Sequence, residues 1–492
     1  MAAAVAGARV AAGGEAEVTS VTEDSRGAGP GVLFVARAGA AHDGHLFAAE
    51  AAGKGAAVAV EREVPLPPGT ACLRVEDSRR ALAELAAELS GRPGRRLLVA
   101  GVTGTDGKTT TTHMAVHLLE SAGCPAGGLS TVSFLVPGEA RDNPTGLTTA
   151  GPVEVQAQLA RMAESGAAAA VVEATSHALV QGRVDACEFD VAAFTNVGRD
   201  HLDYHASWED YLRAKARLID LCAGGWDKGL PKTAVLNLDD ASYEELSRRP
   251  VGRRLSYSLS GRAGADLAAL EVSAEARRCR FRLRGPGGEV PVVLAMAGAF
   301  NVANALCAAG VGIALGLTLE EAAAGLGSFQ GVPGRMEPVD LGQPFAVFID
   351  FAHAAGALAG ALAQLRPLTA GRLLAVFGST ARSDHDRPGM GRAAARGADH
   401  FVITTDDPVG EDPGEIAAAV AAGAAGAEGR FEIELDRRRA IRRAFRLAGP
   451  GDVVLLAGKG HEKTMVLAAG RVPWDERQEA EAALREMGYG PG

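Results

Sequence analysis

A glycine-rich segment at residues 101–110, Gly-Val-Thr-Gly-Thr-Asp-Gly-Lys-Thr-Thr, constrains the fold of this chain more than any other feature. The apolar run 97–100 before it predicts a strand, and residues 111–119 after it predict a helix. A glycine-rich turn between a strand and a helix lets backbone N–H groups surround phosphate oxygens, while the helix dipole adds positive charge. The segment therefore predicts a phosphate-binding loop in which Lys108 contacts phosphates and Thr109 ligates Mg²⁺.

This loop is a variant, because valine stands at position 102, where the usual spacing of such loops places a glycine. An ordinary glycine-rich turn is the alternative interpretation. The run Gly-Lys-Thr-Thr at 107–110 favours phosphate binding, so we expect the chain to bind a nucleoside triphosphate.

Composition and charge exclude several classes of protein. The 492 residues are 47% hydrophobic and 22% charged, which is typical of a globular protein with several cores. A net charge of −10 argues against a nucleic-acid-binding surface. The six cysteines lack metal-ligand spacing, and neither a basic leader nor an apolar run of about 20 residues is apparent. We therefore expect a cytoplasmic monomer with reduced thiols, no membrane span and small-molecule substrates.

Apolar strands alternate with helical segments, which predicts an α/β protein with mostly parallel sheets. We expect three domains, at residues 1–95, 96–332 and 333–492, with a linker at 91–96. An insertion at 251–296, with short β-like runs such as 278–284, is expected to interrupt the alternation of strands and helices in the central segment. The predicted strands are 33–36, 57–60, 97–100, 168–172, 191–195, 234–237, 346–350, 373–377, 400–404 and 452–457.

Polar residues follow two of the central strands. Glu173 ends the strand 168–172, and ligands of open α/β sheets gather at the carboxyl ends of strands. Glu173 is a candidate Mg²⁺ ligand, although a helix-capping or solvated carboxylate is the alternative. The segment 199–205 after the next strand holds two histidines and two aspartates, suited to a metal or a substrate. Because Mg²⁺ prefers oxygen ligands, a histidine ligand would be unusual.

Lys215 lies within the apolar stripe of a predicted helix. The helix begins after Ser207 with the pattern of a capping box, and Tyr211 and Leu218 flank the lysine along the stripe. The residues alone favour a side chain that extends outward to solvent. The alternative is burial, which lowers the pKa of a lysine and makes its amine nucleophilic enough to take up CO₂ as a carbamate.

Several further motifs follow one another along nearly the whole chain. They are Asp-Ser-Arg at 24–26, His-Asp-Gly-His at 42–45, the loop at 103–110, Glu-Ala-Thr-Ser-His at 173–177, Thr-Asn-Val-Gly-Arg-Asp-His-Leu-Asp-Tyr-His at 195–205, Phe-Asn-Val-Ala-Asn at 300–304, Pro-Gly-Arg-Met-Glu at 333–337 and Ala-Gly-Lys-Gly-His-Glu at 457–462. In this order they resemble the ATP-dependent Mur ligases of peptidoglycan synthesis, specifically the MurE type that adds the third residue. The resemblance implies an N-terminal uridine-nucleotide-binding domain, a central P-loop ATPase domain and a C-terminal Rossmann-like domain.

The resemblance also implies roles for single residues in the reaction centre. Lys108 would hold phosphates, Thr109 and Glu173 one Mg²⁺, and His201 a second. Lys215 matches the position at which the family carries a carbamylated lysine, which favours burial of this side chain. The implied ATP contacts are Gly104, Thr105, Gly107, Lys108, Thr109, Thr110, Asn301, Arg335 and Asp350.

Substrate contacts follow in the same way. Those to UDP-MurNAc-L-Ala-D-Glu would be Ser25, His42, Thr148, Thr149, Thr175, Gln181 and Arg183. Those to the incoming amino acid would be Asp406, Asp407, Gly458 and Glu462.

The C-terminal motifs depart from the family pattern. Asp-Asp-Pro-Val at 406–409 stands where members that add diaminopimelate have Asp-Asn-Pro-Arg. That arginine reads a carboxylate as a charged fork, which Val409 cannot do, and Asp407 adds negative charge suited to a cationic side chain. We therefore expect L-lysine or another diamino acid and not meso-diaminopimelate. The segments 350–358 and 378–388 also lack family residues, which leaves a different acceptor or amino acid, or a non-catalytic binding homologue, as alternatives. A folate-polyglutamate type of ligase shares the ATP loop but fits the N-terminal motifs and segment 195–205 poorly.

Overall fold

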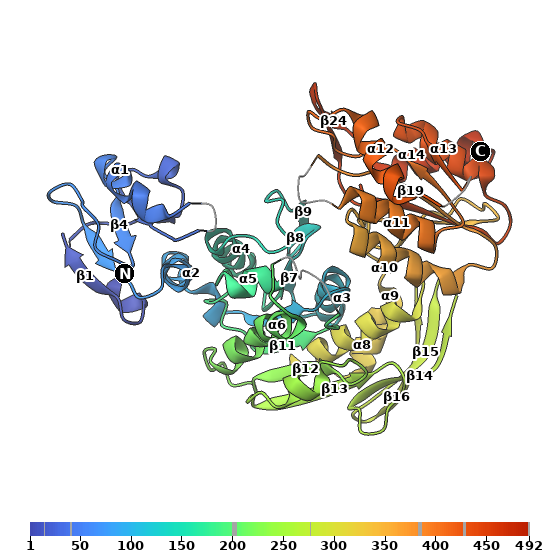
Figure 1. Ribbon diagram of the computed structural model, residues 1–492. Coiled ribbons are helices and arrows are strands. Elements are labelled where there is room, and N and C mark those ends of the chain that lie inside the picture. Colours follow the sequence, from blue (N-terminus) through green and yellow to red (C-terminus); the bar gives the residue numbers. More distant parts are fainter. Residues whose placement is uncertain are drawn as a thin grey trace. The chain divides into compact units, whose positions relative to one another are not determined.

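The structure is a computed structural model that describes residues 1–13, 15–39, 42–198, 204–275, 277–381, 386–426 and 430–490. Figure 1 labels the helices and strands along the chain. The chain divides into two compact units. The first comprises Met1–Leu270, Leu283–Val290 and Ala303–Leu326, and the second comprises Glu271–Arg282, Pro291–Val302 and Gly327–Gly492.

The N-terminal part contains a five-stranded sheet in the order β1-β5-β4-β3-β2, parallel except for β1. Helix α2 (Ser78–Leu89) begins after Asp77, whose carboxylate accepts hydrogen bonds from the first N–H groups of the helix. Helices α2 and α1 (Ala48–Gly53) pack their apolar faces in separate clusters against the sheet. The strands are β1 (Arg9–Ala12), β2 (Ser20–Thr22), β3 (Val32–Val35), β4 (Ala57–Val60) and β5 (Cys72–Arg74).

The central sheet has 11 strands in the order β16-β15-β14-β13-β12-β11-β6-β10-β7-β8-β9. Pairing is parallel from β13 to β7, and β8 and β9 form an antiparallel edge. Strand β6 (Leu98–Thr103) lies between β10 (Ala169–Glu173) and β11 (Val191–Phe194), so their carboxyl ends share one edge. The other strands are β7 (Ala126–Leu129), β8 (Ser133–Val136), β9 (Glu139–Asp142), β12 (Thr233–Asn237), β13 (Arg253–Ser258), β14 (Leu267–Ala274), β15 (Cys279–Gly285) and β16 (Gly288–Leu294).

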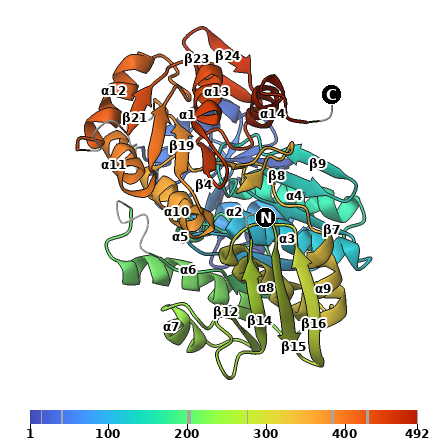
Figure 2. The ribbon, with the colours of Figure 1, turned by 90° about the vertical axis from the view of Figure 1, so that its right-hand side faces the viewer.

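The expectation that residues 251–296 interrupt the alternation of strands and helices is confirmed, because no helix separates the four strands among the described residues of this segment. Strands β13 to β16 of this segment continue the central sheet beyond β12, and Figure 2 shows β14, β15 and β16 side by side. Residues of β15 alternate between buried and more exposed side chains, as expected when a strand has one covered face. The helices of this region are α3 (Lys108–Ser121), α4 (Pro152–Glu164), α5 (Ser176–Val180), α6 (Trp208–Ala223), α7 (Tyr243–Ser247), α8 (Ala299–Ala314) and α9 (Leu319–Ser328).

The C-terminal part is a doubly wound sheet in the order β17-β18-β22-β19-β20-β21, parallel except for β17. Alternate residues of each strand enter two cores, one under helices α10, α11 and α12 and the other under α13 and α14 (Figure 2). The strands are β17 (Glu337–Pro338), β18 (Ala346–Asp350), β19 (Leu373–Phe377), β20 (His400–Ile403), β21 (Phe431–Ile433) and β22 (Val453–Ala457), followed by a hairpin of β23 (Thr464–Leu467) and β24 (Gly470–Pro473). The helices are α10 (Ala355–Leu365), α11 (Arg387–Gly397), α12 (Pro413–Gly423), α13 (Arg437–Leu447) and α14 (Glu476–Glu486).

The predicted α/β class with mostly parallel sheets is confirmed. The predicted linker at 91–96 contains a short 3₁₀ helix, Pro93–Arg95, in which Pro93 and Gly94 are buried. The exact domain boundaries stay predictions. Cysteines 72, 187, 222, 279 and 307 are buried free thiols, as expected. Over the described ranges, no helix has both the length and the apolar character needed to cross a membrane.

Candidate active site

The phosphate loop runs from the end of β6 to the start of α3. Val102 lies in β6 with its side chain fully buried, so the strand continues through the position where a glycine is usual. Gly104 has a φ of +152°, and a Cβ atom there would lie 1.8 Å from Thr195 Oγ1. Gly107 has a φ of +80°, and a Cβ atom there would lie 2.1 Å from Asn304 Oδ1. Both positions require glycine, for backbone conformation and for space.

The segment that follows β11 holds this loop in place. Thr195 Oγ1 donates to the carbonyl oxygen of Asp106 at 2.6 Å, and the N–H of Asp106 donates to Asn196 Oδ1 at 3.0 Å. The N–H of Thr105 donates to the backbone oxygen of Asn196 at 2.8 Å. The Thr-Asn motif thus stabilises a preformed loop, and Lys108 Nζ donates to the oxygens of Gly104 and Thr105 at 3.1 and 2.7 Å.

Glu173 lies beside the start of α3 and has two hydroxyl neighbours. Thr109 Oγ1 lies 3.1 Å from both carboxylate oxygens, and Thr131 Oγ1 lies 3.2 and 3.1 Å from them. The N–H of Thr131 also donates to Glu173 Oε2 at 2.9 Å. A buried carboxylate with two hydroxyls is the hard oxygen donor set that Mg²⁺ prefers, so these residues fit the ion that the resemblance implies.

Lys215 is buried, as the resemblance implies, and the outward orientation that the residues alone favour is not observed. The residue is 1% exposed, and its Nζ donates to the oxygen of Gly104 at 2.7 Å. The same Nζ lies 4.4 Å from the centre of the Tyr211 ring, whose hydroxyl lies 3.2 Å from Thr105 Oγ1. Helix α6 begins as predicted, with the Ser207 side chain accepting from the N–H of Asp210. The carbamate on Lys215 stays a prediction.

His201 lies outside the described residues, together with the rest of 199–203, so its metal role stays a prediction. The two residues that follow belong to an aromatic group beside α5. The rings of Tyr204 and His177 lie 4.1 Å apart, and that of His205 lies 5.0 Å from Tyr204 and 5.2 Å from Tyr211.

Four residues predicted to contact the muramyl substrate lie together. Thr149 Oγ1 donates to the carbonyl oxygen of Glu173 at 2.8 Å and accepts from the N–H of Thr175 at 3.1 Å. Arg183 donates to the carbonyl oxygen of Thr149 at 2.8 Å and to Gln181 Oε1 at 2.7 Å. Burial lowers the pKa of Arg183, and Arg37 adds to this effect. These contacts place the Arg183 guanidinium close to the end of the strand that carries Glu173. Thr148, the fifth candidate of this region, directly precedes Thr149 in the sequence.

The two N-terminal candidates occupy separate turns. Ser25 begins a 3₁₀ helix after Asp24, and its carbonyl oxygen accepts from Lys54 Nζ at 2.9 Å. His42 is exposed. The nearby His45 is buried and bonds Asp43 through Nδ1 at 2.7 Å, while its Nε2 accepts from the N–H of Glu61 at 3.0 Å, which gives it a structural role.

Asn301, Arg335 and Asp350 belong to the second compact unit. Asn301 is buried and donates to the carbonyl oxygen of Ala297 at 2.8 Å. The guanidinium of Arg335 lies 5.2 Å from the centre of the Phe351 ring. Asp350 accepts from the N–H groups of Met336 and Ala352 at 2.8 and 2.9 Å, which fixes the turn after β18. Their contacts to ATP stay predictions.

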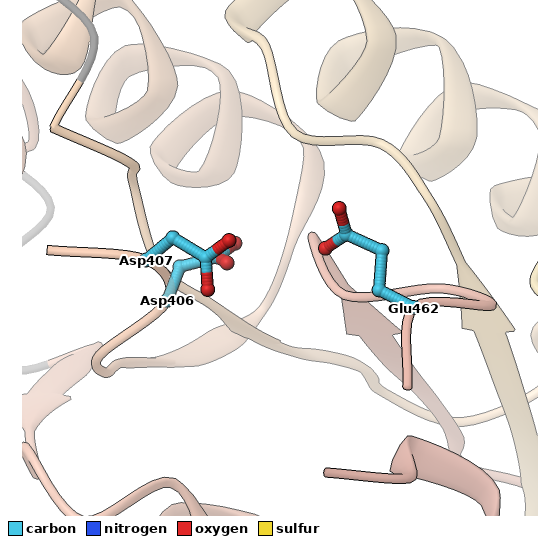
Figure 3. A group of neighbouring side chains, drawn as sticks. All are labelled: Asp406, Asp407 and Glu462. Carbon is cyan, nitrogen blue, oxygen red and sulfur yellow. The ribbon is translucent and has the colours of Figure 1, made fainter. Parts of the chain in front are cut away.

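A cluster of three carboxylates surrounds a buried lysine at the carboxyl ends of β20 and β22. Asp406 and Asp407 point from one segment towards the segment that carries Glu462 (Figure 3). Lys459 Nζ lies 2.6 Å from Glu462, 2.9 Å from Asp407 and 3.7 Å from Asp406. A Cβ atom at Gly458 would lie 2.4 Å from Asp406 Oδ2, so this position requires glycine.

Burial governs the charges of this cluster. It raises the pKa of Asp406 and Glu462, while Lys459 opposes the rise in both. Burial alone would lower the pKa of Lys459, but the three carboxylates around it raise it. One ammonium therefore faces three carboxylates, and the cluster retains a surplus of negative charge that suits a cation.

Val409 is joined to the β23–β24 hairpin, which also contacts Asp407 of this cluster. It has a φ of +55°, which is unusual for a β-branched residue, and its side chain is 53% exposed. Its N–H donates to the carbonyl oxygen of Val466 at 3.0 Å, and Asp407 Oδ1 accepts from the N–H of Val466 at 2.9 Å. The segment 382–385, which holds the end of one altered motif, lies outside the described residues.

Several residues of these groups escaped the sequence analysis. Thr131 follows β7 and joins Glu173 only in the folded chain, and Lys459 reaches Asp407 from another strand end. Thr131 follows a buried strand, as Glu173 ends one, and this position in the sequence could have indicated that Thr131 lies at the same edge of the sheet. Lys459 stands inside a recognised motif, but its counter-ions were not deducible from spacing.

Comparison with known proteins identifies the family. Three family models match in order: "Mur ligase family, catalytic domain" at residues 17–89, "Mur ligase middle domain" at 102–312 and "Mur ligase, glutamate ligase domain" at 334–460. A UDP-N-acetylmuramyl-tripeptide synthetase of Roseiflexus sp. is 44% identical over 96% of each chain. A UDP-N-acetylmuramoyl-L-alanyl-D-glutamate--2,6-diaminopimelate ligase of Geobacillus kaustophilus is 39% identical over 97% of this chain and 96% of its own.

Solved structures agree with this result. A UDP-N-acetylmuramoyl-L-alanyl-D-glutamate--2,6-diaminopimelate ligase superimposes with a TM-score of 0.68 at 30% identity, covering 96% of both chains. A MurF ligase of Thermotoga maritima in complex with ADP has a TM-score of 0.60 at 20% identity over 95% of this chain and 97% of its own, and this likeness concerns the fold alone. The resemblance drawn from the sequence motifs is confirmed.

Proposed function

The chain belongs to the Mur ligase family of ATP-dependent ligases, and from this premise we propose that it adds the third amino acid to UDP-MurNAc-L-Ala-D-Glu. The names of the relatives support this acceptor, since those at 44% and 39% identity both carry a muramyl-peptide substrate in their names. They differ in the amino acid, because only the second names diaminopimelate.

The observation that carries the proposal is the double attachment of Glu173. Its carboxylate bonds Thr109 and Thr131 beside the phosphate loop, and its carbonyl oxygen accepts from Thr149 on the substrate side. One strand end thus joins the phosphate-binding group to the Thr149–Arg183 group. A ligase that transfers phosphate from ATP to a substrate carboxylate requires these two groups to be adjacent.

The reaction has two steps. An oxygen of the substrate carboxylate attacks the γ-phosphorus of ATP, so that a new P–O bond forms, the bond to the β-phosphate oxygen breaks and ADP leaves. The amino nitrogen of the incoming amino acid then attacks the carbonyl carbon, loses a proton and expels phosphate, which forms the amide. Lys108 and the N-terminus of α3 would offset the negative charge that otherwise repels a carboxylate from a polyanion.

Thr109, Glu173, His201 and carbamylated Lys215 would hold Mg²⁺, of which the described residues Thr109 and Glu173 fit the ion in their donor atoms. When bound, Mg²⁺ supplies positive charge to the phosphate oxygens. Thr131 adds a third oxygen beside Glu173 and is a further candidate for this group.

We propose L-lysine or another diamino acid without a second carboxylate as the amino acid. The surplus negative charge of Asp406, Asp407 and Glu462 favours an ammonium group, and Val409 supplies no fork for a carboxylate. Lys459 already offsets part of the negative charge of Asp407. The excess of negative charge is therefore a property of the three carboxylates together and not of Asp407 alone.

The test is phosphate release from ATP with UDP-MurNAc-L-Ala-D-Glu and a panel of amino acids, with the product mass measured. Turnover with lysine or ornithine but not with meso-diaminopimelate supports the proposal. Turnover with diaminopimelate would support the proposed acceptor but contradict the proposed amino acid. It would also show that another residue replaces the missing arginine. Absence of turnover with every amino acid, despite binding of ATP and the nucleotide substrate, would favour a different acceptor or a binding-only homologue.

A further inference from the structure

A buried guanidinium lies directly behind the carboxylate cluster. Arg437 is the first residue of α13, and its side chain is 1% exposed. Its Nε and Nη2 atoms donate to Glu476 at 3.0 and 2.7 Å, and Glu476 also accepts from Trp474 Nε1 at 2.7 Å. The pair is fully desolvated, so it fixes the orientation of the guanidinium in the core of the C-terminal sheet.

The other hydrogen bonds of Arg437 reach two strand ends that are not neighbours. Its Nη2 donates to the carbonyl oxygen of Ala457 at 2.8 Å, and its Nη1 to that of Thr405 at 3.4 Å. Thr405 follows β20 and Ala457 ends β22, whereas β19 lies between these two strands in the sheet. Arg437 therefore bridges two chain segments that no β-ladder connects directly.

The residues next in sequence to these two carbonyl groups form the amino-acid subsite. Asp406 follows Thr405, and Gly458 follows Ala457. Asp406 is 2% exposed, and neither of its carboxylate oxygens has a hydrogen-bond partner among the described residues. Because this carboxylate packs against the α-carbon side of Gly458, a small change in the separation of the two segments would close or open the space around it.

Charged side chains from several chain segments act on the Asp406 carboxylate. Two cations face it, Lys459 on its own side of the cluster and Arg437 from α13. Three further carboxylates, those of Asp407, Glu462 and Glu476, oppose its ionisation. Burial raises the pKa of Asp406, and the charges of Lys459 and Arg437 each oppose this rise.

We propose that Arg437 is a positioning residue of the amino-acid subsite: it holds Asp406 and Gly458 at a fixed separation, so that the Asp406 carboxylate is placed to receive the ammonium group of the incoming amino acid. This inference rests on the proposed function, because it assigns the amino acid to this cluster. The bridge from Arg437 to the Thr405 and Ala457 carbonyl oxygens is the observation that carries it.

The experiment compares three variants of the full-length protein, Arg437→Lys, Arg437→Met and Glu476→Gln. For each, KM is measured separately for the amino acid, ATP and the nucleotide substrate. We expect the KM for the amino acid to rise roughly 10-fold or more, as for loss of a charged hydrogen bond, while the other two KM values change less than about 2-fold. Arg437→Lys keeps the charge without the bridge and should fall between the wild type and Arg437→Met.

The pH profile separates positioning from stability. Loss of the Arg437 charge lets Asp406 take up a proton at higher pH, so the acid limb of kcat/KM for the amino acid should move to higher pH in Arg437→Met. Arg372→Lys is the matched control, because Arg372 pairs with Asp452 at the opposite end of β22. Arg372→Lys should lower the melting temperature but leave both the KM for the amino acid and the pH profile of kcat/KM unchanged.

Two results would overturn the inference. One is an equal rise of all three KM values, and the other is an unchanged amino-acid KM and pH profile in variants that have lost only stability. Failure of the proposed function looks different, because it appears in the wild type as absence of turnover with every amino acid. In that case calorimetric titration of lysine into the wild type and Arg437→Met gives the comparison directly, and equal or absent binding overturns the inference.

Discussion

The buried Nζ atom of Lys215 donates a 2.7 Å hydrogen bond to the carbonyl oxygen of Gly104 in the phosphate loop. Lys108 Nζ donates to the same oxygen at 3.1 Å, so two ammonium groups converge on one carbonyl. The Lys215 amine is thereby held at the phosphate loop, with 1% of the residue exposed. A lysine reacts with CO₂ through its neutral amine, which gives a carbamate anion.

We therefore expect activity to depend on CO₂ through Lys215. In its neutral form the Lys215 amine forms an N–C bond to CO₂ and releases one proton, which leaves a carbamate anion. Removal of dissolved CO₂ should reduce turnover, and bicarbonate should restore it; Lys215→Ala should lose roughly 100-fold and gain nothing from bicarbonate. A carbamate signal in carbon-13 NMR after labelled bicarbonate checks the chemistry. Lys228→Met, which removes a buried lysine paired with Asp190, is the control and should respond to CO₂ like the wild type.

Glu173→Gln should separate metal binding from structure. The amide keeps the size of the side chain but loses the charge that suits Mg²⁺, while its single side-chain oxygen can still accept from the N–H of Thr131. We expect turnover to fall roughly 100-fold and the Mg²⁺ concentration for half-maximal activity to rise. Thr131→Ser keeps the hydroxyl and should behave like the wild type. An unchanged Mg²⁺ dependence in Glu173→Gln would place the ion elsewhere.

Gly104→Ala should impair ATP binding more than stability alone explains. The added Cβ would meet Thr195 Oγ1 at 1.8 Å, so the loop or the segment after β11 must move. Gly166→Ala is the matched control, because Gly166 also has a positive φ, of +84°, but no atom lies within 4 Å of the new Cβ. Gly166→Ala should lose about 1–2 kcal/mol of stability from backbone strain, measured by urea unfolding. Gly104→Ala should lose more because of the clash with Thr195, and only Gly104→Ala should raise the KM for ATP. Equal ATP affinity in the two variants would contradict the steric argument.

Sequence patterns predicted the elements with local causes. The helix after Ser207 begins where its capping pattern places it, and the strand ends at Glu173 and Thr195 lie at one sheet edge as expected from parallel pairing. The residues alone predicted an outward Lys215 side chain, which is not observed. A helical stripe shows that a lysine faces the core, but it does not show whether a hydrogen-bond acceptor such as the carbonyl oxygen of Gly104 lies within reach.

The counter-ions of the carboxylate cluster could not be predicted from the sequence. Asp407 was interpreted as a free negative charge, yet Lys459 from another strand end already binds it. Arg437 escaped notice because it stands in an arginine-rich helix whose other arginines pair with surface acids such as Glu479 and Glu486. Which arginine of such a run points inward depends on the packing of α13 against the sheet, and its two carbonyl acceptors come together only in the tertiary structure.

Asp406→Asn should stabilise the protein while it weakens amino-acid binding. Burial raises the pKa of Asp406 above its unfolded value, so the folded state holds a proton that the unfolded state has already lost. Stability therefore falls as pH rises through the folded pKa, and the asparagine variant escapes this loss. Urea unfolding should show a gain in the free energy of unfolding that is absent at low pH and grows towards neutral pH. A loss of stability at neutral pH would mean that the ion pair with Lys459 outweighs the cost of burial.

Val409→Arg should shift the amino acid towards meso-diaminopimelate. The guanidinium would supply the fork that reads a second carboxylate, and arginine tolerates the positive φ at this position better than a β-branched residue. We expect kcat/KM for diaminopimelate to rise roughly 10-fold or more and that for lysine to fall, because a cation now faces the lysine ammonium. The measurement is phosphate release with both amino acids in competition, with the products separated by mass.

Val409→Met is the control for this change, because it lengthens the side chain without adding charge. It should leave the preference between the two amino acids unchanged. Addition of Asp407→Asn to Val409→Arg removes one carboxylate from Lys459 and should increase the preference for diaminopimelate further, since the cluster then repels the second carboxylate less. If Val409→Met and Val409→Arg shift the preference equally, the side chain at 409 acts through its size, and the charge argument for the amino acid fails at this position.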